Sequence, residues 1–296
     1  MFTSARLGVT LPSSSTYILV FHGSHDPRAQ QAANQLTEAF RQRIQQTDPV
    51  IAAIGGAVPA NAMPRRASTS AQLLRMSAAV ETGDCVVQAA YLECYPQPLV
   101  EQIDYVIRQN SALDASLTVP CRVMPVFLLA GTHVMVDLPA AIAAVQTLPN
   151  QTLTITPHLG SHPGLKRLLN ERMSPLPMEA WILLAHGSRR SRANQAIEQL
   201  ALDLGTVTAY WSTAPSLETR IQELAASGMR RIGIMPYFLF SGVITDAIAQ
   251  MVAQLRLTFP TLTLTLAPPL DGNLPELADL LVDLAAGHAY RKSGEQ

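Results

Sequence analysis

The feature that most constrains the fold of this chain is an internal repeat. Residues 17–36 (YILVFHGSHDPRAQQAANQL) resemble residues 181–200 (WILLAHGSRRSRANQAIEQL), which puts His22 and His186 in equivalent positions. Three further pairs of segments match in the same order: 91–103 with 209–221, 124–131 with 235–242, and 156–160 with 267–271. A duplication explains four matches in one order, so we expect two halves with the same fold.

Each half alternates apolar runs with segments of helical periodicity. The runs YILVF, CVVQAAYL, VMPVFLLA and LTITP of the first half are typical of strands buried on both faces. We therefore predict an α/β protein with two tandem, doubly wound parallel sheets. A Pro-rich stretch places the domain boundary near residue 177, giving domains over 1–177 and 178–296. The first two matched segments lie farther apart in the first half, which predicts an insertion near residues 46–88.

The composition argues against several classes of protein. A net charge of −1 does not suit a general nucleic-acid binder. No apolar run approaches the roughly 20 residues that span a bilayer, and residues 1–16 lack the pattern of a secretory signal, so we expect a cytoplasmic protein without membrane contact. The three cysteines, Cys85, Cys94 and Cys121, have no CxxC spacing, which argues against a disulfide framework or a structural zinc site.

Two imidazoles and a carboxylate follow the predicted strands of the first half. His22 ends the first strand, Glu93 ends the second, and His133 follows the third. Because the carboxyl ends of parallel strands share one edge of a sheet, these side chains can converge there. Gly23 and Gly131 lack a Cβ, so the backbone can turn sharply and a flat ligand can approach. Imidazole suits Fe²⁺ and Co²⁺ and also accepts protons near neutral pH, so ligand and base remain alternative roles.

Several neighbouring polar residues have simpler interpretations. Asp26 and His25 suit the cap of the helix that starts near Pro27. Ser24 and Asp137 suit caps or hydrogen-bond partners of the metal ligands. We interpret His158 and His162, in PHLGSHPG, mainly as turn residues.

The second half lacks most of this constellation. His186 is retained, but Trp211 aligns with Glu93, and a gap of two residues removes the counterparts of Thr132 and His133. One imidazole cannot form the same site. Three arginines that follow His186 can contact substrate carboxylates if the two sheet edges face each other, or they can form a solvated helical turn: Arg189, Arg190 and Arg192.

Three motifs together resemble the class II tetrapyrrole chelatases, specifically the two-domain sirohydrochlorin chelatases of the CbiX/SirB type. They are HGS at 22–24, LE at 92–93 with PQPL after it, and PVFLLAGTHVMVDLP at 125–139. The resemblance covers nearly the whole chain except the insertion. It implies two chelatase-like domains, with His22 and His133 binding the metal and carrying the insertion chemistry and Glu93 assisting.

The resemblance also implies a substrate. Sirohydrochlorin, a flat tetrapyrrole with eight carboxylates, would lie in a cleft between the halves and receive Fe²⁺ or Co²⁺ on the way to siroheme or cobalamin. The substrate contacts would come from Gly23, Ser24, Gly131, Arg189 and Arg190. Some cobalt-linked relatives carry a His-rich tail, and none follows residue 270 here, which favours iron. The metal would be a substrate, with no permanently bound cofactor, and one chain would suffice because its two halves form the cleft.

Two other hypotheses fit the same pattern. The first is a non-catalytic carrier, in which the clustered side chains hold a metal or a tetrapyrrole for another enzyme. The second is a solute receptor with two α/β lobes, which the sequential repeats and the missing secretory signal disfavour.

Overall fold

The computed structural model describes residues 15–47, 85–111, 120–145, 152–188 and 194–287. It contains two four-stranded sheets in which every neighbouring pair is parallel, with strand orders β2-β1-β3-β4 and β6-β5-β7-β8. The first sheet comprises β1 (Thr16–Phe21), β2 (Val86–Tyr91), β3 (Cys121–Pro125) and β4 (Leu153–Ile155). The second comprises β5 (Ala180–Ala185), β6 (Val207–Tyr210), β7 (Arg231–Pro236) and β8 (Thr263–Leu266). The predicted α/β fold with two parallel sheets is confirmed.

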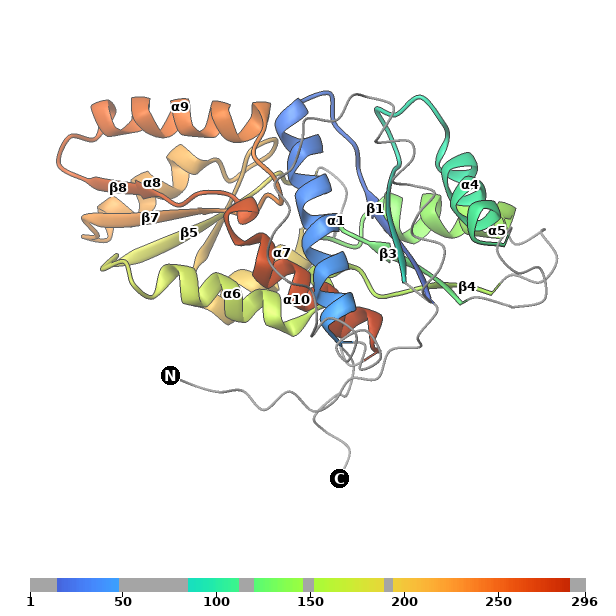
Figure 1. Ribbon diagram of the computed structural model, residues 1–296. Coiled ribbons are helices and arrows are strands. Elements are labelled where there is room, and N and C mark those ends of the chain that lie inside the picture. The colour runs from blue at the N-terminus through green and yellow to red at the C-terminus, as the bar shows by residue number, and fades with distance from the viewer. Residues whose placement is uncertain (1–14, 48–84, 112–119, 146–151, 189–193, 288–296) are drawn as a thin grey trace, which may run out of the picture.

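Helices connect the strands on both faces of the sheets (Figure 1). In the first half these are α1 (Pro27–Thr47), α4 (Leu99–Ser111), α5 (Leu138–Val145) and α6 (Pro163–Met173). In the second half they are α7 (Gln195–Leu204), α8 (Leu217–Ala226), α9 (Val243–Thr258) and α10 (Leu274–Ala285). This alternation is that of a doubly wound sheet.

Strand register supports the duplication at the level of single residues. Leu19 of β1 pairs with Met124 of β3, and Leu183 of β5 pairs with Met235 of β7. These four residues occupy matched positions in the two repeats. The repeat therefore aligns the central strands of both sheets without a shift.

The two halves share one hydrophobic core. Alternate residues of β1, among them Tyr17 and Leu19, join Leu183 of β5 and residues from α1, α7 and α10 in a single buried cluster. The opposite faces form separate outer cores: Ile18 of β1 packs with α4 and α5, and Ile182 of β5 packs with α8 and α9. Strands buried on both faces explain the uninterrupted apolar runs in the sequence.

The last helix of each half packs on the other half. Helix α10 lies along α1, as Figure 1 shows near the centre of the molecule, and it also contacts β3. In the matching arrangement, α6 packs against α7. The terminal helices are thus exchanged between the halves, which connects the two sheets through helices as well as through the shared core.

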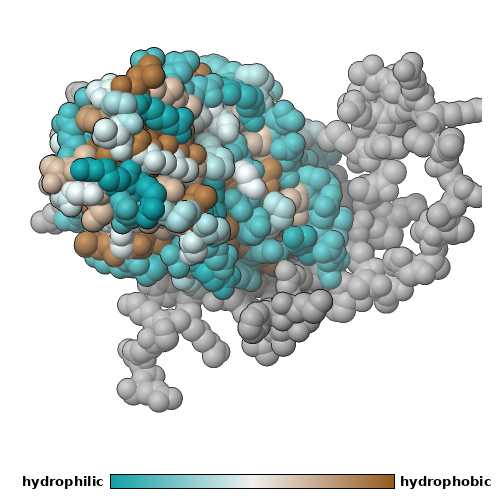
Figure 2. All heavy atoms as spheres, turned by 90° about the vertical axis from the view of Figure 1, so that its left-hand side faces the viewer, coloured by the Kyte–Doolittle hydropathy of each residue, from teal (hydrophilic) through white to brown (hydrophobic). Residues whose placement is uncertain are grey.

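Most of the predicted insertion, residues 48–84, lies outside the described residues. None of the described helices is both long and apolar enough to cross a membrane. On the face that Figure 2 shows, hydrophobic residues are interspersed with hydrophilic ones.

Candidate metal centre

Strand order places the predicted residues at one edge of the first sheet. The chain passes from β1 to β2 on one side and then to β3 on the other side of β1, so the switch point of the topology lies beside β1. Ligands of such sheets bind beyond the carboxyl ends of the strands at this point. His22 follows β1, Glu93 follows β2, and His133 begins the helical segment after β3.

Main-chain pairing extends past β1 and β2 and brings His22 beside Glu93. The Glu93 amide donates to the His22 carbonyl oxygen at 2.9 Å. Gly23 then turns the chain with φ of +94°, and a Cβ on Gly23 would stand 1.9 Å from the Glu93 carbonyl oxygen. Only glycine allows both this φ and this close approach without strain.

A π-helical turn, His133–Asp137, presents the second imidazole. Within this turn His133 Nδ1 lies 2.7 Å from Asp137 Oδ2. An ionised carboxylate only accepts hydrogen bonds, so Nδ1 carries the proton and Nε2 keeps its lone pair. Asp137 therefore orients His133 and fixes its tautomer, which is the kind of role expected from the sequence. Single π-helical turns often occur at functional sites.

Three side chains converge to form a candidate metal-binding cluster, which consists of His22, Glu93 and His133. One donor atom from each lies within 4.8 Å of the others. The two carboxylate oxygens of Glu93 are each 4.0 Å from an imidazole Nε2, Oε2 from that of His22 and Oε1 from that of His133. The imidazole rings meet edge to face, with centroids 4.7 Å apart. The structure thus brings together the three residues predicted from separate strands.

The donor set suits a divalent transition metal. His22 Nδ1 lies 3.2 Å from the Gly23 carbonyl oxygen, which can only accept, so Nε2 of His22 is also the nitrogen with a lone pair. Separations of 4.0 Å leave room for an ion with bonds of about 2 Å. The side chains of His22 and Glu93 are each 53% exposed and that of His133 is 33% exposed, so an ion can reach the cluster from solvent.

A cleft of about 440 Å³ opens beside the cluster and has walls from both halves. The first half contributes His22 and His133 and the second contributes His186. Most other lining side chains are apolar or aromatic, including Phe21, Tyr91, Phe127, Tyr237 and Phe240. The prediction that the two sheet edges face one cleft is confirmed. Sequence reasoning missed the aromatic walls, although FLLAG and FLFSG carry phenylalanine at the same place in both repeats.

The second half departs from the expected alignment in one detail. Tyr210 of β6 pairs with Ala185 as Tyr91 of β2 pairs with Phe21, and the Ser212 amide donates to His186 at 2.9 Å as the Glu93 amide does to His22. Ser212, not Trp211, is therefore the counterpart of Glu93. The alignment was wrong by one residue because the loop after β6 is one residue shorter. The second half still offers no carboxylate there.

The gap after Gly242 is also smaller than expected. The buried residues Leu138 and Ile142 of α5 correspond to Ile248 and Val252 of α9, an offset one residue smaller than that of the preceding strands. The first half thus holds one additional residue instead of two, and the π-helical turn accommodates it. Neither alignment places a histidine opposite His133, so the second half still lacks the second imidazole.

The remaining predicted residues lie in different places. Ser24 and Gly131 line the cleft, and their contact with a substrate stays a prediction. The space around Gly131 is open, since a Cβ on this residue would meet no atom within 4 Å. Asp26 caps α1 by accepting from the Arg28 amide at 2.9 Å. His162 caps α6 away from the cleft lining, and His158 lies 3.1 Å from the Phe127 carbonyl oxygen. The three arginines after His186 lie outside the described residues: Arg189, Arg190 and Arg192.

Comparisons with known proteins identify the family of the chain. The sequence model of the CbiX family matches residues 64–176 and again residues 180–287. The sirohydrochlorin cobaltochelatase of Priestia megaterium is 26% identical over 162 residues, which cover 49% of this chain and 53% of that protein, so the match spans about half of the relative's length.

Solved structures show the same fold. SirB from Bacillus subtilis with Fe³⁺ has a TM-score of 0.66 at 18% identity, with 93% of this chain and 96% of that one covered. SirB from Bacillus subtilis subspecies spizizenii in complex with cobalt has a TM-score of 0.62 at 17% identity, with 93% and 95% covered. The two family matches together take in about three quarters of the chain: the first begins after β1 and α1 and reaches residue 176, and the second covers residues 180–287. The chain belongs to the CbiX family.

Proposed function

We propose that this protein inserts a divalent metal ion, Fe²⁺ or Co²⁺, into sirohydrochlorin. The observation that carries the proposal is the convergence of two imidazole Nε2 atoms and one carboxylate at the wall of an aromatic cleft. Imidazole and carboxylate together bind both metals. The names of the relatives support the tetrapyrrole as substrate, and the product would serve siroheme or cobalamin synthesis.

The reaction sets two chemical requirements. The metal-free macrocycle exchanges two pyrrole N–H protons for one divalent ion, so the products are the metal complex and two protons. The site must therefore hold the ion and then offer proton acceptors. The Nε2 atoms of His22 and His133 can do both in turn, because each lone pair becomes available when the ion leaves. Glu93 is the adjacent carboxylate and can share either role.

The openness of the cluster favours transfer over storage. Three protein donors leave coordination positions free for water or for the pyrrole nitrogens. The exposed His22 and Glu93 side chains let the ion pass without a large opening of the protein. The apolar lining of the cleft can cover a flat macrocycle, while its carboxylates remain near solvent.

A spectrophotometric assay tests the proposal. Sirohydrochlorin with Fe²⁺ or Co²⁺, each with and without enzyme, reports insertion as a change in the absorption spectrum. We expect catalysis by the wild type and loss of at least a hundredfold in rate for His22→Ala and for His133→Ala. His25→Ala is the matched control, because it removes an exposed imidazole outside the cluster, and it should retain the wild-type rate.

Two results would contradict the proposal. Full activity of a protein lacking both His22 and His133 would remove the metal cluster from the mechanism. Saturable binding of metal or tetrapyrrole without any enzyme-dependent spectral change would favour the carrier hypothesis instead. The ratio of the Fe²⁺ and Co²⁺ rates would identify the preferred metal.

A further inference from the structure

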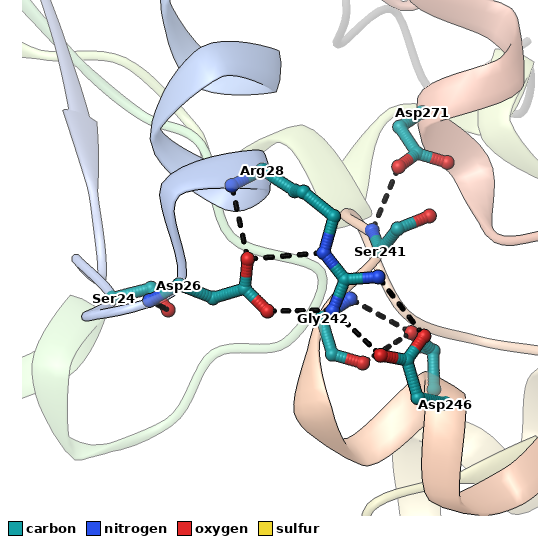
Figure 3. A network of polar contacts seen from close by, with 8 residues as sticks. Ser24, Asp26, Arg28, Ser241, Gly242, Asp246 and Asp271 are labelled. Carbon is teal, nitrogen blue, oxygen red and sulfur yellow. Dashed lines mark hydrogen bonds and ion pairs between the residues drawn. The ribbon is translucent and has the colours of Figure 1, made fainter.

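Arg28 joins the two halves beside the cleft by binding two carboxylates at once (Figure 3). Its Nε and Nη2 atoms donate to Asp26 at 3.1 and 2.7 Å. Its Nη1 and Nη2 atoms donate to Asp246 at 3.1 and 2.6 Å. Each carboxylate is held by two atoms of one planar guanidinium, a geometry that fixes direction as well as distance.

On the first half, Arg28 holds the loop that carries His22. The amide of Asp26 donates to Ser24 Oγ at 3.0 Å, and Asp26 Oδ1 accepts from the Arg28 amide. Ser24 follows Gly23, which abuts the main chain of Glu93. The loop of residues 22–26 is thus fixed to Glu93 at one end and to the guanidinium at the other.

On the second half, Arg28 holds the start of α9. Asp246 lies in the first turn of that helix, whose N-cap is Gly242. Gly242 itself approaches the first half, since a Cβ built on it would lie 3.6 Å from Asp26 Oδ2. The Ser241 amide, directly before this N-cap, donates to Asp271 Oδ2 at 2.7 Å, which further fixes the start of α9 (Figure 3). Residues 237–240, directly before this turn, line the cleft.

The contact between Asp26 and Asp246 depends on the positive charge of Arg28. Hydrogen bonds from Arg28 lower the pKa of Asp26 and the pKa of Asp246, so both carboxylates are ionised. Each carboxylate gains its main charged partner from this one side chain. Without Arg28, the two carboxylates would lie close together between the halves with no cation from that side chain, and would repel.

We propose that Arg28 is a positioning residue that aligns the wall bearing His22 with the opposite wall of the cleft, through Asp26 and Asp246. The inference rests on the proposed function for its kinetic consequence. Arg28 does not touch the three donor side chains, and the main-chain bond from the Glu93 amide to the His22 carbonyl oxygen still holds His22 in its absence. Metal binding should therefore change little, while the fit of the macrocycle between the two walls should suffer.

The experiment compares two arginines of the same helix in the full-length protein. Arg28→Ala removes the contact at the cleft, and Arg43→Ala removes an ion pair between α1 and α10, in which Arg43 Nε lies 2.7 Å from Asp279 Oδ1. The two positions are about 22 Å apart along α1, so Arg43 controls for loss of charge and of contact between the halves. We expect Arg28→Ala to raise the KM for sirohydrochlorin about fivefold with kcat within twofold, and Arg43→Ala to leave both unchanged.

A charge reversal tests the contact itself. Arg28→Glu places a third carboxylate at the site and should raise the KM further, and adding Asp246→Arg should recover most of the loss. The Kd for Co²⁺ should stay within twofold of the wild type in every variant. Equal effects of Arg28→Ala and Arg43→Ala, or a reversed pair no better than Arg28→Glu alone, would overturn the proposal.

Hydrogen exchange separates this inference from the proposed function. Amides of residues 22–26 and 242–246 should exchange faster in Arg28→Ala than in Arg43→Ala, whether or not the protein turns over sirohydrochlorin. Wild-type protein that fails to insert metal would refute the proposed function and leave the exchange result to decide on the contact. Unchanged exchange in both segments would refute the role of Arg28 directly.

Discussion

Replacing Gly23 with alanine should disrupt the metal-binding cluster without touching any of its donor atoms. The new Cβ would stand 1.9 Å from the Glu93 carbonyl oxygen, whereas ordinary contact begins near 3.4 Å. The segments that carry His22 and Glu93 must then separate by about 1.5 Å, the difference between these distances. That movement breaks the hydrogen bond of 2.9 Å between the Glu93 amide and the His22 carbonyl.

The expected cost has two parts. A φ of +94° costs a residue with a Cβ about 1–2 kcal/mol. Loss of one main-chain hydrogen bond adds about 1 kcal/mol, so the free energy of unfolding should fall by about 2–3 kcal/mol in total. Metal sites tolerate changes of about 0.2 Å in bond length, so the displacement of His22 and Glu93 should weaken Co²⁺ binding at least tenfold.

Gly228→Ala provides the control for backbone strain. Gly228 has φ of +90°, and a Cβ there would meet no atom within 4 Å. Gly228→Ala should therefore lose only the strain cost of about 1–2 kcal/mol and bind Co²⁺ as the wild type does. Chemical denaturation and Co²⁺ titration of both variants measure the two effects. Wild-type affinity in Gly23→Ala, or equal destabilisation in both, would refute the reasoning.

Three further predictions concern other groups. Asp137→Ala should weaken Co²⁺ binding about tenfold to a hundredfold, measured by titration, because His133 loses the carboxylate that orients it. Burial raises the pKa of Cys121 to about 12, so at pH 8 a maleimide should modify the exposed Cys94 and leave Cys121 unmodified in mass spectrometry of the folded protein. Burial lowers the pKa of His158 and of His162, so below about pH 6.5 these two residues bind protons more readily in the unfolded chain than in the folded one. Chemical denaturation at a series of pH values should therefore show the free energy of unfolding decreasing below about pH 6.5, and decreasing less steeply in His162→Gln.

The sequence predicts the fold well because its signals are local. Apolar runs mark strands wherever they occur, and the repeat applies the same interpretation twice. The convergence of His22, Glu93 and His133 follows from the geometry of parallel strands, since residues after neighbouring strands must share an edge.

Three features escape the sequence for physical reasons. A one-residue change in the loop before α8 leaves no local signal, so Trp211 was aligned where Ser212 lies. The π-helical turn at His133 has the composition of an ordinary helix, and only its hydrogen bonding reveals the added residue. Arg28 and Asp246 are 218 positions apart, and an exposed arginine has many possible partners before the chain folds.

The exchange of terminal helices bears on the order in which the chain can fold during synthesis. Helix α10 is the last described helix to be made, yet it covers α1, which is the first. The buried face of α1 stays without this partner until residues 274–285 have left the ribosome. A nascent chain halted after β5 would therefore leave the part of α1 that faces α10 exposed to solvent and to chaperones, and the emergence of residues 274–285 becomes the step that covers it.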